Sequence, residues 1–367
     1  MNILCVCPIG IGNYLLCYPA FDLLRESMPS ASLHLLALRE GIAQLARADS
    51  LWSGVTVFDP GKLSYNPVVL YSTFAALRKH KFDASLNFFP SNTWHYHLLP
   101  WLTAIPNRYA FRYPVAPWSK LSMLSNRFVS VDEGLHDVHQ NYRLVNLFLG
   151  ADHRPSQPRF PVLFTEADRQ WASDHFRTFS SSSLRIGIHP GSSVEHGMGS
   201  KRWQSVKFAR LIDSACRYLN AEAYIFGGPD EETVKREVAS AMECTVHVVA
   251  PTSLARTAAL LAHCTLCICN DSGLMHMAAC QGIPTAGIFG PTDEKRNGPF
   301  GPKTLVIRKH LKGFPVWTAR NVGDRTLPKG IDPAESLNRL DPDDAWRQLR
   351  PWIETIMETS IAPHPSL

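Results

Sequence analysis

Polar residues that can bind an anion stand directly after an apolar stretch of the chain. The run CTLCIC is followed by Asn270, Asp271, Ser272 and Gly273, and then by the small-residue stretch LMHMAACQ. This pattern predicts a buried strand and a helix over residues 274–281, capped by Asp271 or Ser272. The free N–H groups and the positive dipole end of such a helix face what lies beyond the strand. The turn therefore predicts a site for a diphosphate or for sugar hydroxyls.

Three more polar side chains are placed to reach the same kind of ligand. His276 lies on the first turn of the predicted helix and faces its opening. Ser192 and Ser193, in the segment HPGSSVEHGMGSKRW, follow the end of a mid-chain strand. Their hydroxyls are able to donate to diphosphate oxygens. The sequence thus predicts two phosphate-binding loops that are far apart along the chain.

A glycine-containing loop follows the first predicted strand. It reads PIGIGN over residues 8–13, and Gly12 and its neighbours let the backbone approach a ligand, while Asn13 stands at the start of a helix. The alternative interpretation is a tight turn capped by Asn13. The loop lacks the Gly-Lys-Ser/Thr ending of a P-loop, which excludes that class of nucleotide site.

The elements that must position these loops alternate between strand and helix. Strands are predicted at ILCVCP, SLHLLAL, VTVFD and DASLNFF, and then at LRIGIHPG, AEAYIFGG, TVHVVA, CTLCICN and TAGIFG. Helical patterns separate them, which predicts α/β structure with parallel sheets whose ligands bind outside the carboxyl ends of the strands. Prolines between Pro155 and Pro161 mark a linker. Two doubly wound domains are the simplest assembly.

Composition sets limits on the class of protein. The chain has 367 residues, 45% hydrophobic and 19% charged, which is typical of a folded protein long enough for two domains. Its apolar runs are too short for a transmembrane helix, and MNILCVCPIG has no basic lead-in typical of a signal peptide. Cys264 and Cys267 have zinc-knuckle spacing, but a second pair is absent, so we expect the nine cysteines to be reduced in a cytoplasmic protein.

Basic charge is concentrated in one segment. The net charge is +5, and the segment from Arg78 to Arg127 holds seven Lys and Arg residues against Asp83 alone. Aromatic residues are interleaved with them. Such a surface binds an anionic membrane face or an anionic glycolipid, or is a solvated face above buried rings. We expect no nucleic-acid partner, because no nucleic-acid-binding motif accompanies the charge.

The motifs together resemble a known family. The turn at Asp271-Ser272-Gly273 with His276, followed by Pro-Thr, Phe-Gly-Pro-Thr-Asp and Asn-Gly-Pro, is similar to the signature of glycosyltransferase family 9, the ADP-heptose:lipopolysaccharide heptosyltransferases. MNILCVCPIGIGNYLLCYPAFDLLRESMP, IGIHPGSS with SKRW, and YIFGGPDEE agree with it in order and spacing. The resemblance covers most of residues 1–310.

The resemblance implies a fold and a domain plan. The fold is of the GT-B type, with two doubly wound Rossmann-like domains facing across a cleft. Residues 1–160 are expected to form an acceptor-binding domain, and residues 161–345 a nucleotide-sugar-binding domain. Residues 346–367 are expected to form a C-terminal helix and tail that pack back on the N-terminal domain.

The resemblance also implies roles for the polar residues. Lys201 neutralises the leaving diphosphate, Glu231 holds the nucleoside hydroxyls, and Asp271 binds the sugar and takes part in catalysis. The residues expected to bind the donor are Gly12, Ser192, Ser193, Lys201, Glu231, Asp271, Ser272, Gly273 and His276. No metal or other cofactor is expected, because no DxD-type run is present to chelate a divalent ion.

Position 13 departs from the family pattern. The family usually has Gly-Asp here, and that aspartate is the general base that takes the proton of the acceptor hydroxyl. Asn13 is expected among the catalytic residues, but an amide orients a hydroxyl without accepting its proton. The base then comes from elsewhere, with His95, His97 or His189 as candidates, or the transfer needs little base assistance, or catalysis is impaired.

Three hypotheses for function follow. The first is an inverting glycosyltransferase that moves heptose from ADP-heptose onto lipopolysaccharide core or a related surface glycan, with peripheral contact to the cytoplasmic face of the inner membrane. The second is a non-catalytic nucleotide-sugar or glycan-binding protein of the same fold, which Asn13 suggests. The third is a nucleotide-sugar epimerase, for which we find no dedicated set of carboxylates.

Overall fold

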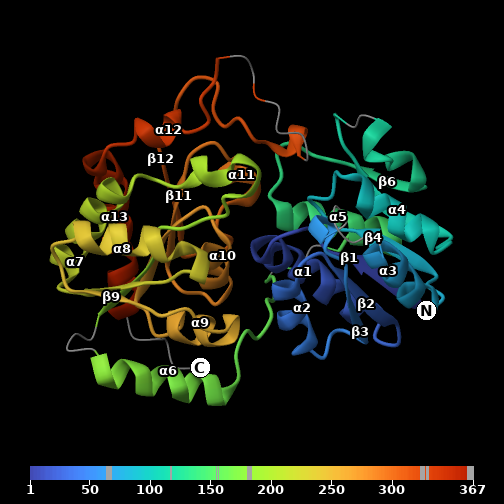
Figure 1. Ribbon diagram of the computed structural model, residues 1–367, viewed down its shortest axis with the longest axis horizontal. Coiled ribbons are helices and arrows are strands. Elements are labelled where there is room, and N and C mark those ends of the chain that lie inside the picture. Colours follow the sequence, from blue (N-terminus) through green and yellow to red (C-terminus); the bar gives the residue numbers. More distant parts are fainter. Residues whose placement is uncertain are drawn as a thin grey trace. The chain divides into compact units, whose positions relative to one another are not determined.

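The computed structural model describes residues 1–62, 68–115, 118–153, 155, 157–179, 184–322, 327 and 330–361. Its internal contacts divide the chain into two units (Figure 1). Unit 1 comprises Met1–Val162 and the later segment Trp317–Thr326. Unit 2 comprises Leu163–Val316 and Leu327–Leu367. Each unit is built on one six-stranded sheet.

The sheet of unit 1 is parallel throughout, in the order β3-β2-β1-β4-β5-β6. Its strands are β1 (Asn2–Val6), β2 (Ser32–Ala37), β3 (Gly54–Val57), β4 (Ala84–Asn87), β5 (Asn107–Arg112) and β6 (Arg127–Ser130). The chain leaves β1 in one direction through β2 and β3, and returns to extend the other side from β4. This reversal puts the topological switch point between β1 and β4, where doubly wound folds bind ligands.

Helices cover the sheet of unit 1. They are α1 (Ile11–Ser27), α2 (Glu40–Arg47), α3 (Val68–Arg78), α4 (Trp94–Leu102) and α5 (Asp137–Leu149), with short 3-10 turns η1 (Pro60–Lys62), η2 (Trp118–Lys120), η3 (Ser122–Leu124) and η6 (Ala319–Asn321). α1 and α5 pack against each other. Side chains of α3 and α4 pack with those of β1 and β2 in one apolar core.

The sheet of unit 2 is also parallel, in the order β12-β11-β10-β7-β8-β9. Its strands are β7 (Arg185–His189), β8 (Glu222–Ile225), β9 (Val246–Val248), β10 (Leu266–Asn270), β11 (Thr285–Phe289) and β12 (Thr304–Arg308). β7 and β10 are neighbours at the switch point, and both end in polar residues. The loops after these two strands therefore meet at one edge of the sheet.

The helices of unit 2 include the C-terminal one. They are α6 (Glu166–Phe179), α7 (Ser205–Leu219), α8 (Glu232–Ala241), α9 (Leu254–Leu261), α10 (Gly273–Cys280), α11 (Glu294–Asn297), α12 (Glu335–Asn338) and α13 (Pro342–Ile361), with 3-10 turns η4 (Glu195–Lys201) and η5 (Pro229–Glu231). Within the described residues, no helix is both long enough and apolar enough to cross a membrane.

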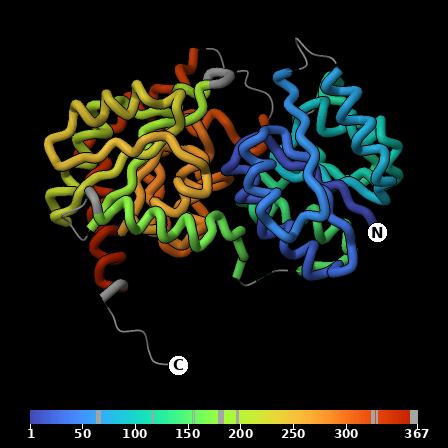
Figure 2. Tube along the Cα trace, turned by 60° about the horizontal axis from the view of Figure 1, so that its bottom comes forward, coloured from blue at the N-terminus to red at the C-terminus, as the bar shows by residue number. Residues whose placement is uncertain are grey.

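The C-terminal helix corrects one expectation. Residues 346–367 were expected to pack back on the N-terminal domain, but α13 packs against α7 and β12 of unit 2, and residues 362–367 lie outside the described residues. Ala345, Leu349 and Ile353 are fully buried in the core of that unit, because their four-residue spacing places them on one face of the helix. Figure 2 shows α13, in red, beside the yellow and green elements of unit 2.

A different segment joins unit 1. The chain returns to it at Trp317–Thr326, where the side-chain amide of Asn92 donates to the carbonyl oxygen of Val322 at 2.7 Å. The predicted division at residue 160 lies two residues from the end of the first segment of unit 1, Val162. No prediction could be made for this returning segment from the sequence.

Candidate functional site

The predicted polar turn lies between β10 and α10. Ser272 is the N-cap of α10, and its hydroxyl oxygen accepts from the backbone N–H of Met275 at 3.4 Å. Gly273, the first residue of the helix, is half-buried. A helix start with small residues leaves its first N–H groups open to a ligand, which is how such termini bind phosphates.

Asp271 holds the centre of an ionic cluster. Its carboxylate oxygen Oδ2 lies 2.8 Å from the Lys201 ammonium and accepts from the hydroxyl of Thr292 at 2.6 Å. The Asp271 side chain is 3% exposed and that of Lys201 13%. Burial opposes ionisation, but the Lys201 charge and the bonds from Lys201 and Thr292 hold the pKa of Asp271 below its usual value. The pair therefore places a cation beside the start of α10.

His276 is buried beside this pair and is neutral at ordinary pH. Burial lowers the pKa of His276 to about 4, and the attraction of Asp271 only partly offsets this. Its ring atom Nδ1 is buried and has no hydrogen-bond partner among the described residues. A neutral imidazole with a free nitrogen offers a hydrogen bond to a ligand without adding a charge.

The loops after β7 and β8 share a second cluster. His189 Nε2 lies 3.0 Å from Glu231 Oε2, and its Nδ1 lies 2.8 Å from the Ser272 hydroxyl. Glu231 also accepts from the backbone N–H of Gly228 at 2.9 Å, and it lies 3.5 Å from Arg202. Burial would raise the pKa of Glu231, but His189, Gly228 and Arg202 together lower it to about 2.

Ser192 and Ser193, in the loop after β7, have different environments. Ser192 is buried, and its carbonyl oxygen accepts from Arg202 Nε at 3.0 Å, while Ser193 is exposed. The carbonyl oxygen of Pro190, just before them, accepts from the side chain of Asn270 at 2.7 Å. Main-chain groups thus fix the loop, which leaves the Ser193 side chain open to solvent.

Asn13 lies in unit 1, at the carboxyl end of β1. It is half-buried on the first turn of α1, and its amide Nδ2 donates to the carbonyl oxygen of Ile9 at 2.5 Å. Gly10, the N-cap of α1, has φ of 106°, which favours glycine. Gly12 is buried within the helix. The loop is therefore a tight turn, but Gly10 and not Asn13 is its N-cap, which corrects that part of the alternative interpretation.

The histidines considered as substitute bases are engaged or weakly basic. His97 Nδ1 bonds to the Ser125 hydroxyl at 2.8 Å, and His189 is bonded at both ring nitrogens. Burial lowers the pKa of both His95 and His97 to about 4. Each is thus buried, and neither of the two in unit 1 is tuned to take a proton near neutral pH.

The structure unites the predicted residues of unit 2. Lys201, Glu231, Asp271, Ser272 and His276 all lie beyond the carboxyl ends of β7, β8 and β10. Sequence reasoning missed Thr292 and did not link His189 to either neighbour. Thr292 lies in the Phe-Gly-Pro-Thr-Asp motif, so the sequence marks it as a candidate site residue. A hydroxyl in a loop does not, however, indicate which side chain it will contact.

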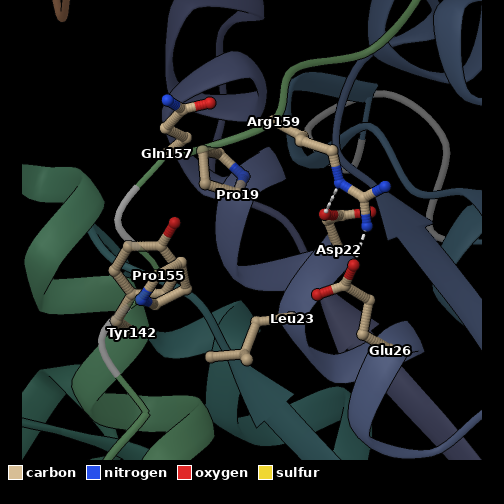
Figure 3. A pocket seen from close by; sticks show the side chains of 8 residues that line it. All are labelled: Pro19, Asp22, Leu23, Glu26, Tyr142, Pro155, Gln157 and Arg159. Atoms are coloured by element: carbon tan, nitrogen blue, oxygen red, sulfur yellow. Dashed lines mark hydrogen bonds and ion pairs between the residues drawn. The ribbon is translucent and has the colours of Figure 1, made fainter.

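A separate pocket of about 180 Å³ lies in unit 1, and none of the predicted site residues lines it (Figure 3). It is lined by α1, by Tyr142 of α5 and by the linker residues Pro155, Gln157 and Arg159. Arg159 pairs with Asp22 at 2.8 Å and with Glu26. Its charge is thus already neutralised by α1, and the pairs fasten the linker to that helix.

Thiolates, imidazoles and carboxylates are the side chains that can hold a metal ion. All nine cysteines are free thiols, and Cys264 and Cys267 are buried. Over the described part of the chain, His, Cys, Asp and Glu side chains form no group of three or more that could hold a metal ion. Transfer without a metal stays a prediction.

Two parallel Rossmann-like sheets whose polar loops follow the carboxyl ends of the strands are the architecture of GT-B glycosyltransferases. The family model described as glycosyltransferase family 9 (heptosyltransferase) matches residues 70–320. The chain belongs to this family and is a glycosyltransferase.

Individual relatives agree with this assignment. The chain is 23% identical over 324 residues to lipooligosaccharide heptosyltransferase 2 of Haemophilus influenzae, covering 84% of this chain and 88% of the relative. Its fold matches E. coli ADP-heptose lps heptosyltransferase II with a TM-score of 0.72 and 20% identity, covering 98% and 100% of the two chains. It also matches E. coli heptosyltransferase WaaC with ADP, with a TM-score of 0.70 and 18% identity over 97% and 100%.

Proposed function

We propose that the protein is an inverting glycosyltransferase that moves heptose from ADP-heptose onto lipopolysaccharide core or a related surface glycan. The observation that carries this proposal is the buried pair of Lys201 and Asp271 at the start of α10, with Glu231 in the neighbouring loop. The choice of donor is supported by the similar proteins, which are named as heptosyltransferases and include a structure of one of them with ADP.

Each part of the donor has a matching group in unit 2. The Lys201 ammonium and the open N–H groups of α10 suit the diphosphate, whose charge grows as the glycosidic bond breaks. The ionised carboxylate of Glu231 suits the hydroxyls of a ribose, because a carboxylate accepts two hydrogen bonds at once. Asp271 suits a sugar hydroxyl through the oxygen that Lys201 and Thr292 leave free. No resident metal or cofactor is part of the proposal, and the nucleotide sugar is a substrate.

The reaction is a displacement at the anomeric carbon. The acceptor hydroxyl oxygen bonds to this carbon as the bond to the diphosphate oxygen breaks, and the hydroxyl loses its proton. Asn13 orients the hydroxyl but cannot take that proton. Burial leaves His95 and His97 too weakly basic to take it near neutral pH, so the donor bond is largely broken before the proton passes to water, and a stronger base at this place would speed the transfer.

The acceptor side of the proposal is an anionic glycolipid at the cytoplasmic face of the inner membrane. Residues 84–131 contain no acidic side chain and four Lys and Arg residues. Within them, Trp118 is 82% exposed, and Trp101 and Met123 are also exposed. The turns that carry Trp118 and Met123 pack on α4, which carries Trp101. Exposed tryptophan with basic residues is typical of a surface that meets anionic lipid.

Vesicle binding tests the membrane contact. We expect the protein to sediment with vesicles containing phosphatidylglycerol and much less with phosphatidylcholine alone, and Trp118→Ala to lower the bound fraction. Val206→Ala, which removes an exposed apolar side chain from α7 of unit 2, is the matched control. Equal binding of all three proteins would contradict the contact.

Nucleotide binding tests the donor. In a thermal-shift panel of ADP, UDP, GDP, TDP and CMP, we expect ADP to stabilise the protein most, by about 2.7 kcal/mol at a hundredfold excess over its dissociation constant. Preference for another nucleotide would contradict the heptose donor but keep a glycosyltransferase. Binding of a confirmed donor without turnover on any acceptor would favour the non-catalytic alternative.

A further inference from the structure

His189 occupies a central position that the roles above do not use. It is the last residue of β7 and is 3% exposed. One ring nitrogen meets Glu231, in the loop after β8, and the other meets Ser272, at the start of α10. A single imidazole therefore joins the carboxylate assigned to the nucleoside to the cap of the helix assigned to the diphosphate.

The partners fix how the ring bonds. An ionised carboxylate only accepts, so Nε2 of His189 carries the proton that it donates to Glu231. Nδ1 lies 2.8 Å from the Ser272 hydroxyl and accepts from it wherever Nδ1 carries no proton. The Ser272 oxygen keeps lone pairs for the N–H of Met275, which it caps. The hydrogen bonds from Glu231 through His189 and Ser272 to Met275 therefore form one connected series, in which each bond orients the group that makes the next.

Close packing holds the chain of bonds in place. A Cβ atom on Gly191 would lie 2.0 Å from Glu231 Oε1 and 2.8 Å from His189 Nε2, so the loop after β7 passes directly over both groups. The carboxylate is also held by the backbone N–H of Gly228 at 2.9 Å. A shift of Glu231 toward a ligand must therefore move the imidazole and, with it, the hydroxyl of Ser272.

We propose that His189 is a positioning residue that couples the nucleoside end of the donor site to its diphosphate end. Occupation of Glu231 by ribose hydroxyls orients the imidazole and so sets the Ser272 cap and the first N–H groups of α10 for the diphosphate. The two halves of a nucleoside diphosphate then bind cooperatively. This inference rests on the proposed donor site and adds a link between its two ends.

A double-mutant cycle measures the link. The dissociation constant of ADP is determined by calorimetry for the wild type, Glu231→Gln, Ser272→Ala and the double variant, and again for all four with His189→Gln. Glutamine reaches one partner but does not span both. His247→Gln is the matched control, because His247 also bonds to a glutamate, Glu222, at 3.1 Å but lies on β9, away from α10.

With His189 present, the double variant should lose less affinity than the product of the two single losses, by about threefold or more. With His189→Gln or His189→Ala, the two losses should multiply within about twofold. His189→Gln should also raise the donor KM more than it lowers kcat. His247→Gln should leave both the coupling and the ADP affinity unchanged.

The outcomes separate this inference from the proposed function. If the wild type binds ADP but the affinity losses of Glu231→Gln and Ser272→Ala simply multiply, the coupling is overturned and the proposed donor site is unaffected. A His189→Gln protein that is less stable to heat but keeps the full coupling shows a structural role only, and also overturns the inference. No binding of any nucleotide by the wild type counts against the proposed function itself.

Discussion

Lys201 and Asp271 form one pair, but their environments are unequal. Asp271 is 3% exposed, whereas 13% of the Lys201 side chain reaches solvent. Removing Lys201 leaves a buried charge that has lost its ion pair and keeps the hydrogen bond from Thr292. Removing the charge of Asp271 leaves an ammonium on a long, flexible stem that reaches water. Removing one partner of a buried ion pair so that the other charge stays buried, as the loss of Lys201 would do, lowers the free energy of unfolding by about 3–5 kcal/mol.

We therefore predict that Lys201→Met lowers the free energy of unfolding more than Asp271→Asn does. Both variants should lose turnover, by about 10²-fold or more for Lys201→Met. Asp271→Asn should keep or strengthen ADP binding, because Lys201 is then free to meet the diphosphate. Thermal unfolding and ADP titration of the two proteins check this. Weaker ADP binding in Asp271→Asn than in Lys201→Met would contradict the assigned roles.

Asn13 gives a second prediction at the scale of a residue. Replacing it with aspartate supplies a carboxylate on the first turn of α1, where the helix dipole favours the ionised form. The bond from Asn13 Nδ2 to Ile9 is lost, so the new side chain turns away from that carbonyl oxygen. We expect kcat to rise by about tenfold or more at neutral pH, within the range of general base catalysis.

Asn13→Ala is the control for this substitution, since it removes the amide without adding a base. Its kcat should fall or stay unchanged. An Asn13→Asp protein with wild-type kcat would mean that proton transfer does not limit the reaction or that another group already performs it. The measurement is initial velocity at saturating donor and acceptor.

At the scale of elements, regular strands and helices could be predicted from the sequence better than the segments that join them. β1, β7, β10 and β11 were predicted because apolar runs flanked by turn residues mark buried parallel strands. α4, β5, β6 and α5 were not. β6 is a four-residue strand with exposed ends, and α4 contains Pro100, so neither has the pattern of a buried element. Short edge strands carry little periodicity to detect.

The loop after β7 packs tightly against the carboxylate of Glu231. Gly191 has no room for a side chain, because a Cβ there would lie 2.0 Å from the Glu231 carboxylate. Gly191→Ala should displace Glu231 and weaken ADP binding by about tenfold or more, since hydrogen bonds to a largely buried carboxylate are lost. Gly199→Ala is the control: its Cβ would meet nothing nearer than Val194 at 4.0 Å. Calorimetric titration of both variants with ADP checks the difference.

The whole molecule shows where sequence reasoning stops. The two-unit plan could be predicted, since each unit has its own alternation of strands and helices. The return of residues 317–326 to unit 1 and the packing of α13 on unit 2 could not. A helix with an apolar face, such as that of Ala345, Leu349 and Ile353, predicts burial but does not name the partner. The same holds for Thr292 and His189, whose partners are distant in sequence.

The two units should differ in how much stability they lose in acid. Burial lowers the pKa of His34, His95 and His97 in unit 1 to about 4, and that of His276 in unit 2 to about 4. In the unfolded chain these groups titrate near 6.5. Above that pH these histidines are neutral in both states and do not change the free energy of unfolding. As the pH falls toward 4, the unfolded chain takes up protons that the folded chain does not, and the free energy of unfolding falls.

Each such histidine lowers the free energy of unfolding by up to about 1.4 kcal/mol per pH unit in this window. Unit 1 has three histidines with a strongly lowered pKa and unit 2 has one. Between pH 6.5 and 4, the free energy of unfolding should therefore fall more steeply for unit 1 than for unit 2. Hydrogen exchange of peptides from each unit, corrected for intrinsic rates, measures this. His97→Gln should reduce the slope of unit 1 by about a third and leave unit 2 unchanged, since one of its three groups no longer titrates. Equal slopes in both units would mean that the buried histidines do not control acid stability.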